Sequence, residues 1–479
     1  MTATLSEVVA GHAATRPDRP AFLCEGRVTT WQDYDRAGWE HAGRLATAGL
    51  EPGDGVAVVL PDGPGVHEWF LGVERAGLVI VGIGPRAGEA EVRHLVERSG
   101  ARALVSSPVV AGRDAAEVVA GLREGGLDLL HLPATDDAPG ASRPVPERPG
   151  VGTDELWLLN STSGTTGLPK CVMHTQSRWM YFHRLAVSAG AMTGDDVFMS
   201  LLPAPFGFGL WTAHFTPTLL GAPVAVMPRF NATDALRLAG ELRVTVLACV
   251  TTQLVMMLND PALSGVDLGP LRAVFTGGEA VPYERAAEFE DRTGARVLQF
   301  YGSNETGALS HTSVADDRDH RLRTAGRVIP DMHVRLLDGD DDVTATGGPG
   351  EPVCRGPATS LGYWDDPEAN DRLVTADGWM RTGDLAEIDA DGYLRIVGRL
   401  SDIIIRGGKN ISAGQVEAEV GTHPAVAMVA AVPMPDEVFG ERVCVYVVAR
   451  PGPPPSLEDL TDHLLRRGAG KELLPEHLV

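Results

Sequence analysis

The chain has 479 residues, with 64 acidic and 41 basic side chains and a formal net charge of −23. This length allows two or more domains and a large buried core. The negative charge argues against non-specific binding to nucleic acid or to an anionic membrane, so an anionic ligand needs a local site. The five cysteines are scattered and form no CxxC pair, which indicates neither a disulfide framework nor a zinc site.

The first ten residues contain neither a basic segment nor a long apolar core, so they do not resemble a secretory leader. No apolar run elsewhere is long enough to span a bilayer. We therefore expect a protein of the reducing cytoplasm, with no membrane partner and no nucleic-acid partner.

The N-terminal part of the chain alternates helix-like and strand-like segments. Apolar spacing predicts two helices and three strands there. This βαβ pattern is typical of an α/β fold in which helices cover the faces of a parallel sheet. The predicted segments are helices at 31–48 and 89–99 and strands at 55–60, 78–83 and 103–105.

A glycine-rich turn in this part offers one alternative function. Gly82, Gly84 and Ala87 follow a predicted strand and match the loose G-x-G-x-x-A fingerprint of dinucleotide-binding proteins. That fingerprint also requires an acidic residue about 20 positions later, to bind the ribose. Leu-Val-Ser-Ser stands there, at 104–107. We therefore favour an ordinary tight turn between strand and helix.

A loop rich in Ser, Thr and Gly joins two predicted short strands, at 156–159 and 171–173, and ends in Lys170. Glycines let backbone N–H groups converge on an anion, hydroxyls add donors, and lysine adds a mobile charge. The loop is not a Walker A loop, because Pro-Lys-Cys stands where Gly-Lys-Ser/Thr is needed. A flexible linker is the alternative. Only three lysines stand against 38 arginines, which favours a functional Lys170.

Aromatic residues follow farther along the chain. Residues 201–211 interleave Phe206, Phe208 and Trp211 with glycine and proline, so a regular amphipathic helix is not expected. Such a stretch can line a pocket for a flat or cyclic apolar group, and plain core packing is the alternative. Trp179 and Phe182 share one helical face, and we expect them in the core.

Two further strands, at 244–250 and 271–275, are predicted from their apolar runs. Gly277 and Gly278 follow the second of them. Glycines at the carboxyl end of a strand let a planar ring approach the backbone closely.

Residues 163–170, Ser-Gly-Thr-Thr-Gly-Leu-Pro-Lys, resemble the phosphate loop of the adenylate-forming superfamily. That superfamily holds acyl-CoA synthetases, luciferases and the adenylation domains of peptide synthetases. The segments similar to its other motifs follow in the family's order, at 301–305, 379–384, 392–399 and 402–420. The resemblance therefore covers nearly the whole chain.

This resemblance implies an α/β fold with two domains. The expected large N-terminal domain, 1–398, has mixed and parallel sheets with flanking helices and a small barrel-like β part. A hinge is expected at 399–401, and a small mobile α+β domain at 402–479.

The resemblance also implies the roles of individual residues. Lys170, Glu305 and Arg399 would be catalytic, and Glu305 would bind Mg²⁺. Tyr301 would stack on adenine, and Asp384 would accept hydrogen bonds from both ribose hydroxyls. Asn304 replaces the family's usual Thr, which leaves its contact with phosphate open. The set implied to bind ATP or AMP is Thr162, Ser163, Gly164, Thr165, Thr166, Gly167, Gly277, Gly278, Glu279, Tyr301, Gly302, Ser303, Asn304, Asp384 and Arg399.

The other substrates have implied sites as well. Gly408 and Lys409 would border the tunnel of coenzyme A. The aromatic motif looks most similar to those of ligases for aryl or alicyclic acids. The acid pocket implied by the resemblance comprises Phe206, Phe208, Gly209, Val250, Thr276 and Gly302.

The implied function is ATP-dependent activation of a carboxylic acid to an acyl-adenylate, followed by transfer to coenzyme A. Two alternatives stay open: transfer of the acyl group to an acyl carrier protein or partner enzyme, and a non-catalytic adenylate-binding protein. A homodimer is also considered. No hydrolase elbow, HExxH helix or other metal-binding spacing occurs in the sequence.

The resemblance further implies a terminal Gly-Lys motif, whose lysine contacts the reacting carboxylate and the α-phosphate. Lys471 follows Gly470, but residues 471–476 resemble the segment before that motif. The sequence stops at Val479, ahead of the expected lysine. Either it is part of a longer protein or the enzyme lacks this residue. We expect this chain to bind ATP and acyl-adenylate but to form adenylate slowly.

Overall fold

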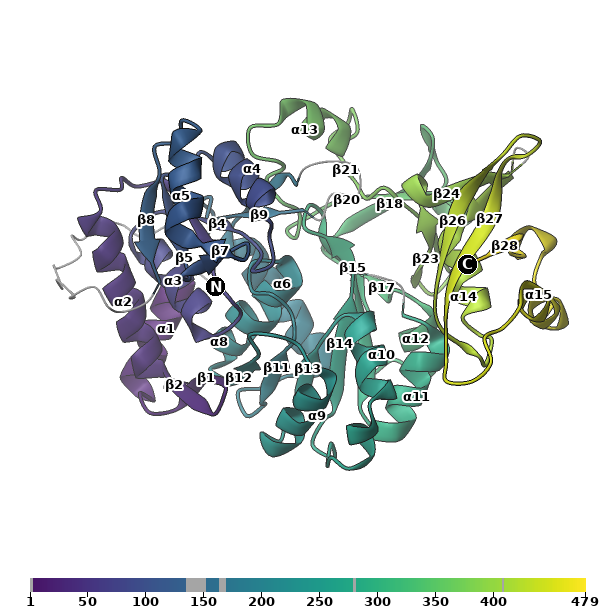
Figure 1. The fold of residues 1–479 in the computed structure, drawn as a ribbon, viewed down its shortest axis with the longest axis horizontal. Coiled ribbons are helices and arrows are strands. Elements are labelled where there is room, and N and C mark those ends of the chain that lie inside the picture. Colours follow the sequence, from purple (N-terminus) through teal and green to yellow (C-terminus); the bar gives the residue numbers. More distant parts are fainter. Residues whose placement is uncertain (1–2, 135–151, 163–168, 279–280, 407–408) are drawn as a thin grey trace.

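The computed structural model describes residues 3–134, 152–162, 169–278, 281–406 and 409–479 (Figure 1). Two large sheets with their helices form most of the molecule, and a small unit built from the last strands lies at the opposite end from α1 and α2. The segment 133–152 is rich in Pro, Gly, Ala and Asp, which predicts a surface connection, and most of it lies outside the described residues. Within them, no helix is long and apolar enough to cross a membrane.

The first large sheet contains the predicted N-terminal strands. Its neighbouring strands run parallel, except that β10 is antiparallel to β9 at one edge. The predicted βαβ pattern and its parallel sheet are therefore confirmed. Across the sheet, the six strands are β10 (Cys171–His174), β9 (Leu158–Ser161), β4 (Val79–Gly82), β3 (Gly55–Val59), β5 (Ala103–Ser106) and β8 (Leu130–Pro133).

Helices and one hairpin accompany this sheet. The amphipathic helix predicted at 31–48 is present as α2, whose buried face includes Trp31, Tyr34 and Leu45. The predicted helix at 89–99 is α4. The elements are α1 (Leu5–Thr15), α2 (Trp31–Thr47), α3 (Pro64–Arg75), α4 (Glu89–Ser99), α5 (Ala115–Glu124), β6 (Val109–Val110) and β7 (Arg113–Asp114).

The second large sheet has six parallel strands in its centre and antiparallel strands at both edges. The two strands predicted at 244–250 and 271–275 are its neighbours β13 and β14. Across the sheet, its strands are β17 (Arg327–Val328), β16 (Gly307–His311), β15 (Arg296–Ser303), β14 (Ala273–Gly277), β13 (Val246–Ala248), β11 (Phe198–Ser200), β12 (Val224–Val226), β1 (Pro20–Cys24) and β2 (Arg27–Thr30).

Short helices connect the strands of this second sheet. In Figure 1, α9, α10 and α11 lie together beside β13 and β14. The helices are α9 (Ala232–Glu241), α10 (Thr251–Asn259), α11 (Tyr283–Thr293), α12 (Arg318–Arg323) and the 3₁₀ turn η2 (Pro261–Ser264).

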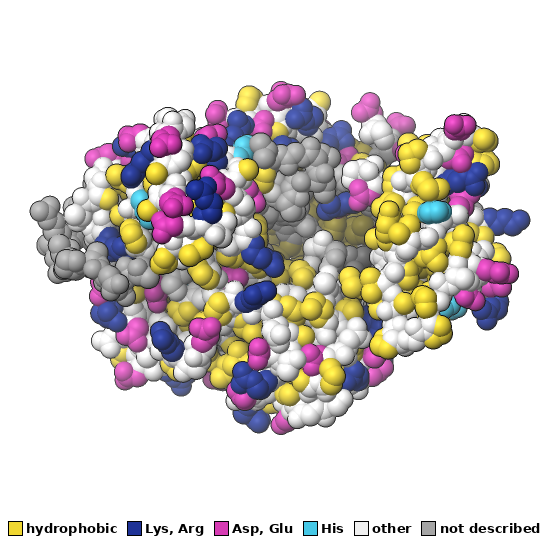
Figure 2. Space-filling model, in the orientation of Figure 1, with side chains coloured by type: hydrophobic (Ala, Val, Ile, Leu, Met, Phe, Trp, Pro, Cys, Tyr) yellow, Lys and Arg dark blue, Asp and Glu magenta, His cyan; other side chains and the backbone are white. Residues whose placement is uncertain are grey.

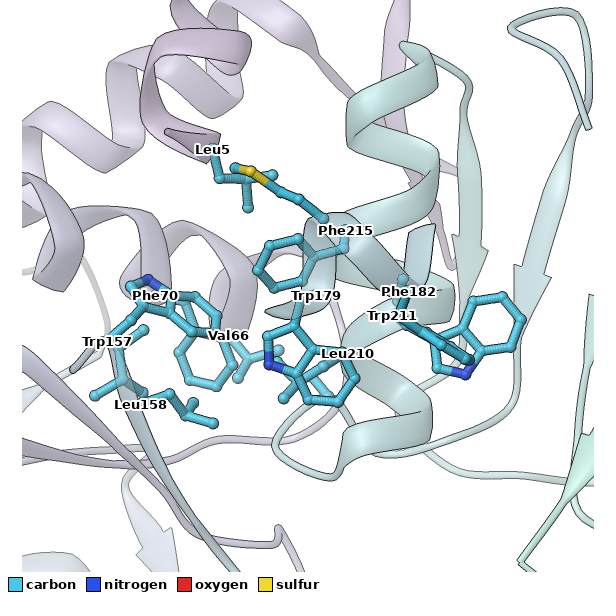
Figure 3. Close-up of a cluster of buried hydrophobic side chains, with 14 of the residues drawn as sticks. Leu5, Val66, Phe70, Trp157, Leu158, Trp179, Phe182, Leu210, Trp211 and Phe215 are labelled. Carbon is cyan, nitrogen blue, oxygen red and sulfur yellow. The ribbon is translucent and has the colours of Figure 1, made fainter. Parts of the chain in front are cut away.

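One helical stretch lies in the middle of the molecule and differs from expectation. Residues 207–220 are helical, although interleaved glycine and proline argued against a helix. They form α7 (Gly207–Gly209), the π-helical turn η1 (Leu210–Phe215) and α8 (Thr216–Leu220). Because the π-helical turn is irregular, this stretch is helical without being the regular amphipathic helix that its glycines and prolines argue against. Figure 3 shows Trp211 and Phe215 of this turn beside Trp179 and Phe182 of α6 (Gln176–Gly190), within one buried cluster.

The expected barrel-like β part is an open arrangement. A four-stranded sheet and a hairpin are linked by one bridge between Gly350 and Ala386, and they do not close into a barrel in the described residues. Some of these strands span only two residues, too few for a continuous ladder. The elements are β19 (Asp341–Asp342), η3 (Thr344–Thr346), β18 (His333–Asp338), β20 (Glu351–Arg355), α13 (Pro367–Leu373), β21 (Met380–Arg381), β22 (Asp384–Ile388) and β23 (Leu394–Arg399).

The last part of the chain forms a compact α+β unit with its own core, which includes Val416 of α14 and Leu460 and Leu464 of α15. Figure 2 shows hydrophobic side chains gathered over this unit. Met428, Tyr446 and Val448 are large hydrophobic side chains of this unit that are exposed. Its elements are η4 (Leu400–Asp402), β24 (Ile403–Arg406), β25 (Lys409–Ser412), α14 (Ala413–Val420), β26 (Val426–Asp436), β27 (Gly440–Ala449), α15 (Leu457–Arg466), η5 (Lys471–Leu473) and β28 (His477–Leu478).

Candidate active site

Most of the predicted site residues that the structure describes meet at the carboxyl ends of parallel strands in the nine-stranded sheet. Strands β11, β13, β14 and β15 run parallel, so their carboxyl ends lie side by side. Ligands bind outside the carboxyl ends of the strands in open sheets of this kind. The segments that follow these four strands line a cavity of about 990 Å³.

One wall of the cavity is aromatic. Phe208 stacks on Trp211 with ring centroids 5.5 Å apart, and Phe182 meets Phe300 edge to face at 4.8 Å. All six residues of the predicted acid pocket line this cavity. The aromatic residues of its wall are Trp179, Phe182, Phe206, Phe208, Trp211 and Phe300.

Glycines at two points let the backbone pack closely enough to form this wall. A Cβ atom at Gly209 would lie 2.1 Å from the carbonyl oxygen of Pro203. At Gly302, it would lie 1.7 Å from the carbonyl oxygen of Gly307. Neither backbone can shift easily, so both positions require glycine.

At the other end of the cavity, Asp384 lies between Tyr301 and Arg399. The Tyr301 hydroxyl donates to Oδ2 of Asp384 over 2.7 Å, and Nε of Arg399 donates to Oδ1 over 3.2 Å. Burial raises the pKa of the Asp384 carboxyl, and the bonds from Tyr301 and Arg399 oppose that increase. Tyr301, Arg399, Gly277 and Gly278 line the cavity. Asp384 is not one of the lining residues, but it is hydrogen-bonded to two of them, Tyr301 and Arg399.

The turn before Asp384 is held by a buried carboxylate. Oε1 of Glu351 accepts a hydrogen bond from the backbone N–H of Gly383 over 3.0 Å, and Oε2 forms an ion pair with Arg381 at 2.5 Å. The Thr382 hydroxyl in turn accepts from the Asp384 N–H over 3.2 Å. These contacts fix the direction in which the Asp384 side chain leaves the backbone.

A third group connects the Glu305 carboxylate to Lys170. The Tyr363 hydroxyl donates to Oε1 of Glu305 over 2.7 Å, and Nζ of Lys170 lies 4.8 Å from the centroid of the Tyr363 ring. Burial, and then the Glu305 charge, raise the pKa of Tyr363 well above its ordinary value, so the hydroxyl stays a donor. Tyr363 was not among the predicted site residues. None of the motif segments named in the sequence contains it.

The strand pair β9 and β10 holds the two ends of the predicted phosphate loop together. The backbone N–H of Thr162 donates to the carbonyl oxygen of Lys170 over 3.0 Å, and the Lys170 N–H donates to the Thr162 hydroxyl over 3.2 Å. Both residues line the cavity. Lys409 begins strand β25. The remaining predicted residues, Ser163, Gly164, Thr165, Thr166, Gly167, Glu279 and Gly408, lie outside the described residues.

Comparison with known proteins decides the family. The model of the AMP-binding enzyme family matches residues 9–364, and that of the AMP-binding enzyme C-terminal domain matches residues 415–479. The chain belongs to the AMP-binding enzyme family. The predicted resemblance to the adenylate-forming superfamily is thereby confirmed.

Individual relatives of this AMP-binding enzyme match over almost the whole chain. A medium-chain fatty-acid–CoA ligase of Escherichia coli K12 is 30% identical, covering 100% of this chain and 87% of the relative. A salicylyl-CoA synthase/salicylate adenylyltransferase of a Streptomyces species is 34% identical, covering 95% and 85%. The crystal structure of ATP-bound MatB from Rhodopseudomonas palustris superposes with a TM-score of 0.88 at 25% identity, covering 100% and 95%.

The glycine-rich turn considered as a dinucleotide fingerprint is filled by protein in this AMP-binding enzyme. A Cβ atom at Gly84 would lie 2.9 Å from Cζ of Phe206, and one at Gly82 would lie 3.0 Å from Cβ of Pro205. Because the two glycines have no side chains, Pro205 and Phe206 of the aromatic wall can pack directly against this turn. A dinucleotide would have to displace that segment.

Proposed function

We propose that this protein is an AMP-forming acyl-CoA ligase that activates an aryl or alicyclic acid. One observation carries the proposal: a single cavity joins an aromatic wall to the carboxylate of Glu305, the cation of Lys170 and the ring of Tyr301. An apolar cyclic acid and a nucleotide triphosphate can be held there at the same time. The salicylyl-CoA relative supports the choice of an aryl acid.

The nucleotide end of the cavity suits the parts of ATP. The ring of Tyr301 and the exposed backbone at Gly278 offer two faces to adenine. Asp384 has two acceptor oxygens for the ribose diol, and the Tyr301 and Arg399 hydrogen bonds hold it in place. Lys170 and Arg399 supply positive charge for the phosphates.

Glu305 is the residue that would hold Mg²⁺. Magnesium in nucleotide enzymes is bound through one or two carboxylates together with substrate phosphates, so it needs no cluster of protein ligands. Within the described residues, no group of three or more His, Cys, Asp or Glu side chains could hold a metal. A single carboxylate oriented by Tyr363 therefore fits. Bound Mg²⁺ would supply neutralisation of the phosphate charge.

Two displacements make up the reaction. In the first, a carboxylate oxygen of the acid attacks the α-phosphorus of ATP, the bond from that phosphorus to the bridging oxygen breaks, and pyrophosphate leaves. In the second, the CoA thiolate attacks the acyl carbon of the mixed anhydride, and AMP leaves with the electrons of the C–O bond. Fixed charges at the cavity lower both barriers by stabilising charge that develops in the transition state.

We assign residues 399–401 as the hinge between a large domain, 1–398, and a mobile domain, 402–479, that rotates between the two steps. The backbone N–H of Leu400 donates to the carbonyl oxygen of Gly383 over 2.9 Å, and the Ser401 hydroxyl donates to Asp402 over 2.7 Å. A rotation of the mobile domain would have to break these hydrogen bonds at η4 and form others in their place.

The test is a screen of acids for pyrophosphate release in the presence of ATP and Mg²⁺. Benzoate, salicylate and cyclohexanecarboxylate should exceed acetate and octanoate by at least about tenfold in kcat/KM, because even one methylene is worth about 1–3 kcal/mol in a shaped pocket. Preference for acetate or for octanoate would overturn the assignment of the acid.

The acceptor is tested separately, by chromatography of the products after CoA is added. Acyl-CoA should accumulate together with AMP. Pyrophosphate release without thioester formation would contradict CoA as the acceptor and favour a carrier protein. Glu305→Gln, verified as folded by circular dichroism, is the control that links pyrophosphate release to this cavity.

A further inference from the structure

A buried arginine, Arg178, is part of the lining of the same cavity as Asn304 and Glu305. Arg178 in α6 is only 4% exposed, and its Nε donates to the carbonyl oxygen of Ala358. Its Nη2 is buried without a hydrogen-bond partner in the described residues. Burial lowers the pKa of Arg178 to about 9, an effect that the Glu305 charge opposes, so Arg178 is still a cation at neutral pH. A buried charge of this kind is retained at a cost in stability.

A chain of hydrogen bonds, here called the relay, joins Arg178 to Asn304 through His174 and Asn160. Each member donates to the next, so the relay has one direction. Nη1 of Arg178 bonds Nδ1 of His174 over 2.5 Å, and arginine can only donate. Nδ1 of His174 is therefore the acceptor, and Nε2 carries the proton. Burial, and then the Arg178 charge, hold the pKa of His174 well below its ordinary value, so the ring is neutral.

The next two bonds follow from that tautomer. Nε2 of His174 donates to Oδ1 of Asn160 over 2.8 Å. Asn160 then has only its NH₂ group to offer, and this donates to Oδ1 of Asn304 over 3.2 Å. The orientation of both amides is thus determined by the arginine, independently of how each amide is assigned.

Because the Asn304 carbonyl oxygen accepts the hydrogen bond from Asn160, the NH₂ group of Asn304 is available to donate into the cavity. Asn304 lines the cavity between Glu305 and Gly207, and a Cβ atom at Gly207 would lie 2.5 Å from its Oδ1. The carbonyl oxygen is therefore turned toward protein on two sides. No described residue accepts a hydrogen bond from the NH₂ group. A donor next to the carboxylate assigned to Mg²⁺ suits an anionic phosphate oxygen.

We propose that Arg178 is a positioning residue: through His174 and Asn160, it holds the Asn304 amide with its NH₂ group toward the cavity, where that group donates to a phosphate oxygen of the bound nucleotide. This inference rests on the proposed function, because it takes the ligand to be ATP or its adenylate. A reversed amide would present a carbonyl oxygen to the phosphate, and the two would repel.

The first experiment inverts the group at the end of the relay. Binding of ATP with Mg²⁺, in the absence of any acid, is measured by calorimetry on the full chain. Asn304→Asp keeps the oxygen that Asn160 contacts but replaces the NH₂ group by an acceptor. Asn304→Thr keeps a donor. The Asp variant should bind ATP at least about tenfold more weakly than the Thr variant, or 1.4 kcal/mol. Equal affinities of these two variants would overturn the proposal.

The second experiment tests the coupling of Arg178 to Asn304. Arg178→Gln is measured in the wild-type chain and in the Asn304→Thr chain. A hydroxyl rotates to suit its partner and needs no relay, so the loss of ATP affinity should be at least about fivefold smaller in the Thr background. The same loss in both backgrounds would show a purely structural Arg178 and overturn the proposal.

A second variant keeps the cycle usable where Arg178→Gln does not fold. Asn160→Leu interrupts the relay in its middle, and it should show the same dependence on residue 304, with thermal unfolding as the check on folding. The cycle is also separate from the acid screen. A chain that activates no acid but shows the coupling would refute the ligase function alone, and an active ligase with additive losses would refute the relay alone.

Discussion

The Tyr363 hydroxyl and the Glu305 carboxylate form a 2.7 Å hydrogen bond in the lining of the cavity, although the two residues are 58 positions apart in the chain. The Tyr363 ring also faces Nζ of Lys170. One side chain therefore contacts both the carboxylate assigned to Mg²⁺ and the cation assigned to the phosphates. Its two contacts can be separated by substitution, because the hydroxyl makes one and the ring makes the other.

Tyr363→Phe should lower the rate of adenylate formation by about 3- to 30-fold, because a hydrogen bond to a charged group is worth about 1.5–3 kcal/mol when buried and less when partly exposed. The ring contact with Lys170 is retained. The measurement is pyrophosphate release at saturating ATP over a range of Mg²⁺ concentrations. Glu305→Gln is the matched control and should lose more activity. An unchanged rate in Tyr363→Phe would show that the hydroxyl does not orient Glu305 for the reaction.

Asp384→Ala should weaken ATP binding by about 10- to 150-fold, the equivalent of about 1.5–3 kcal/mol for hydrogen bonds to a charged group. The loss has two sources, the missing acceptors for ribose and the release of Tyr301 and Arg399. Calorimetric titration with ATP gives the affinity directly. Asp391→Ala removes the same charge from an exposed position of the β22–β23 hairpin and should bind ATP like the wild type. Wild-type affinity in Asp384→Ala would refute the ribose assignment.

Sequence patterns predicted the parts of this fold that depend on local order. The strands flanking Lys170, the parallel βαβ unit and helix α2 all follow from apolar spacing and turn residues, which act within a few positions. The aromatic stretch shows where this fails. A helix containing Gly207 and Gly209 has poor local propensity, and it forms because those glycines let the backbone pack against Pro203 and Asn304.

In the candidate site, too, the features that depend on local sequence were predictable and the contacts between distant segments were not. Motifs gave the residues that line the cavity, because those residues stand at strand ends that meet at one edge of the sheet. The partners of these residues were not predictable: Tyr363 for Glu305, and the chain from Arg178 to Asn304. Such contacts join distant segments and depend on which strands become neighbours. Trp179 and Phe182 were expected in the core, and they lie both in the core and along the cavity.

Gly84→Ala should change the use of the acid without changing ATP binding. The added methyl group would approach within 2.9 Å of the Phe206 ring and push it toward the cavity. The KM for large cyclic acids should rise by at least about threefold, since overpacking costs 1–3 kcal/mol and part of it is relieved by movement of the ring. Steady-state kinetics with benzoate and salicylate measure this effect.

Gly88→Ala is the matched control for Gly84→Ala. Gly88 precedes helix α4 in the same turn, and a Cβ atom there would have no neighbour within 4 Å. This variant should keep wild-type kinetics. An equal effect of both substitutions would show that Phe206 does not transmit the change, and that the turn itself is sensitive.

The segment that leads into Phe206 is held by a partly buried carboxyl group, that of Asp62. Oδ1 of Asp62 accepts a hydrogen bond from the backbone N–H of Ala204 over 2.9 Å. Burial raises the pKa of Asp62 to about 6, while the bond from Ala204 and the charge of Arg86 oppose that increase. The folded protein therefore binds the Asp62 proton more tightly than the unfolded chain does, whose aspartate pKa is about 3.9.

This difference makes the stability of the protein depend on pH with a definite sign. Below about pH 4, Asp62 is protonated in both states and makes no contribution; between about pH 4 and pH 6 the unfolded chain releases the proton first, so the free energy of unfolding falls as pH rises. Above pH 6 the full penalty applies, at most about 3 kcal/mol at 1.36 kcal/mol for each pKa unit. Asp62→Asn keeps an acceptor for the Ala204 N–H and carries no charge. It should unfold at higher urea concentration than the wild type at pH 7.5, and the gain should shrink toward pH 4.5. Asp371→Asn, at an exposed position, corrects for the removal of one negative charge from a chain of net charge −23. A gain of the same size at both pH values, after that correction, would show that Asp62 ionises equally in the folded and unfolded states.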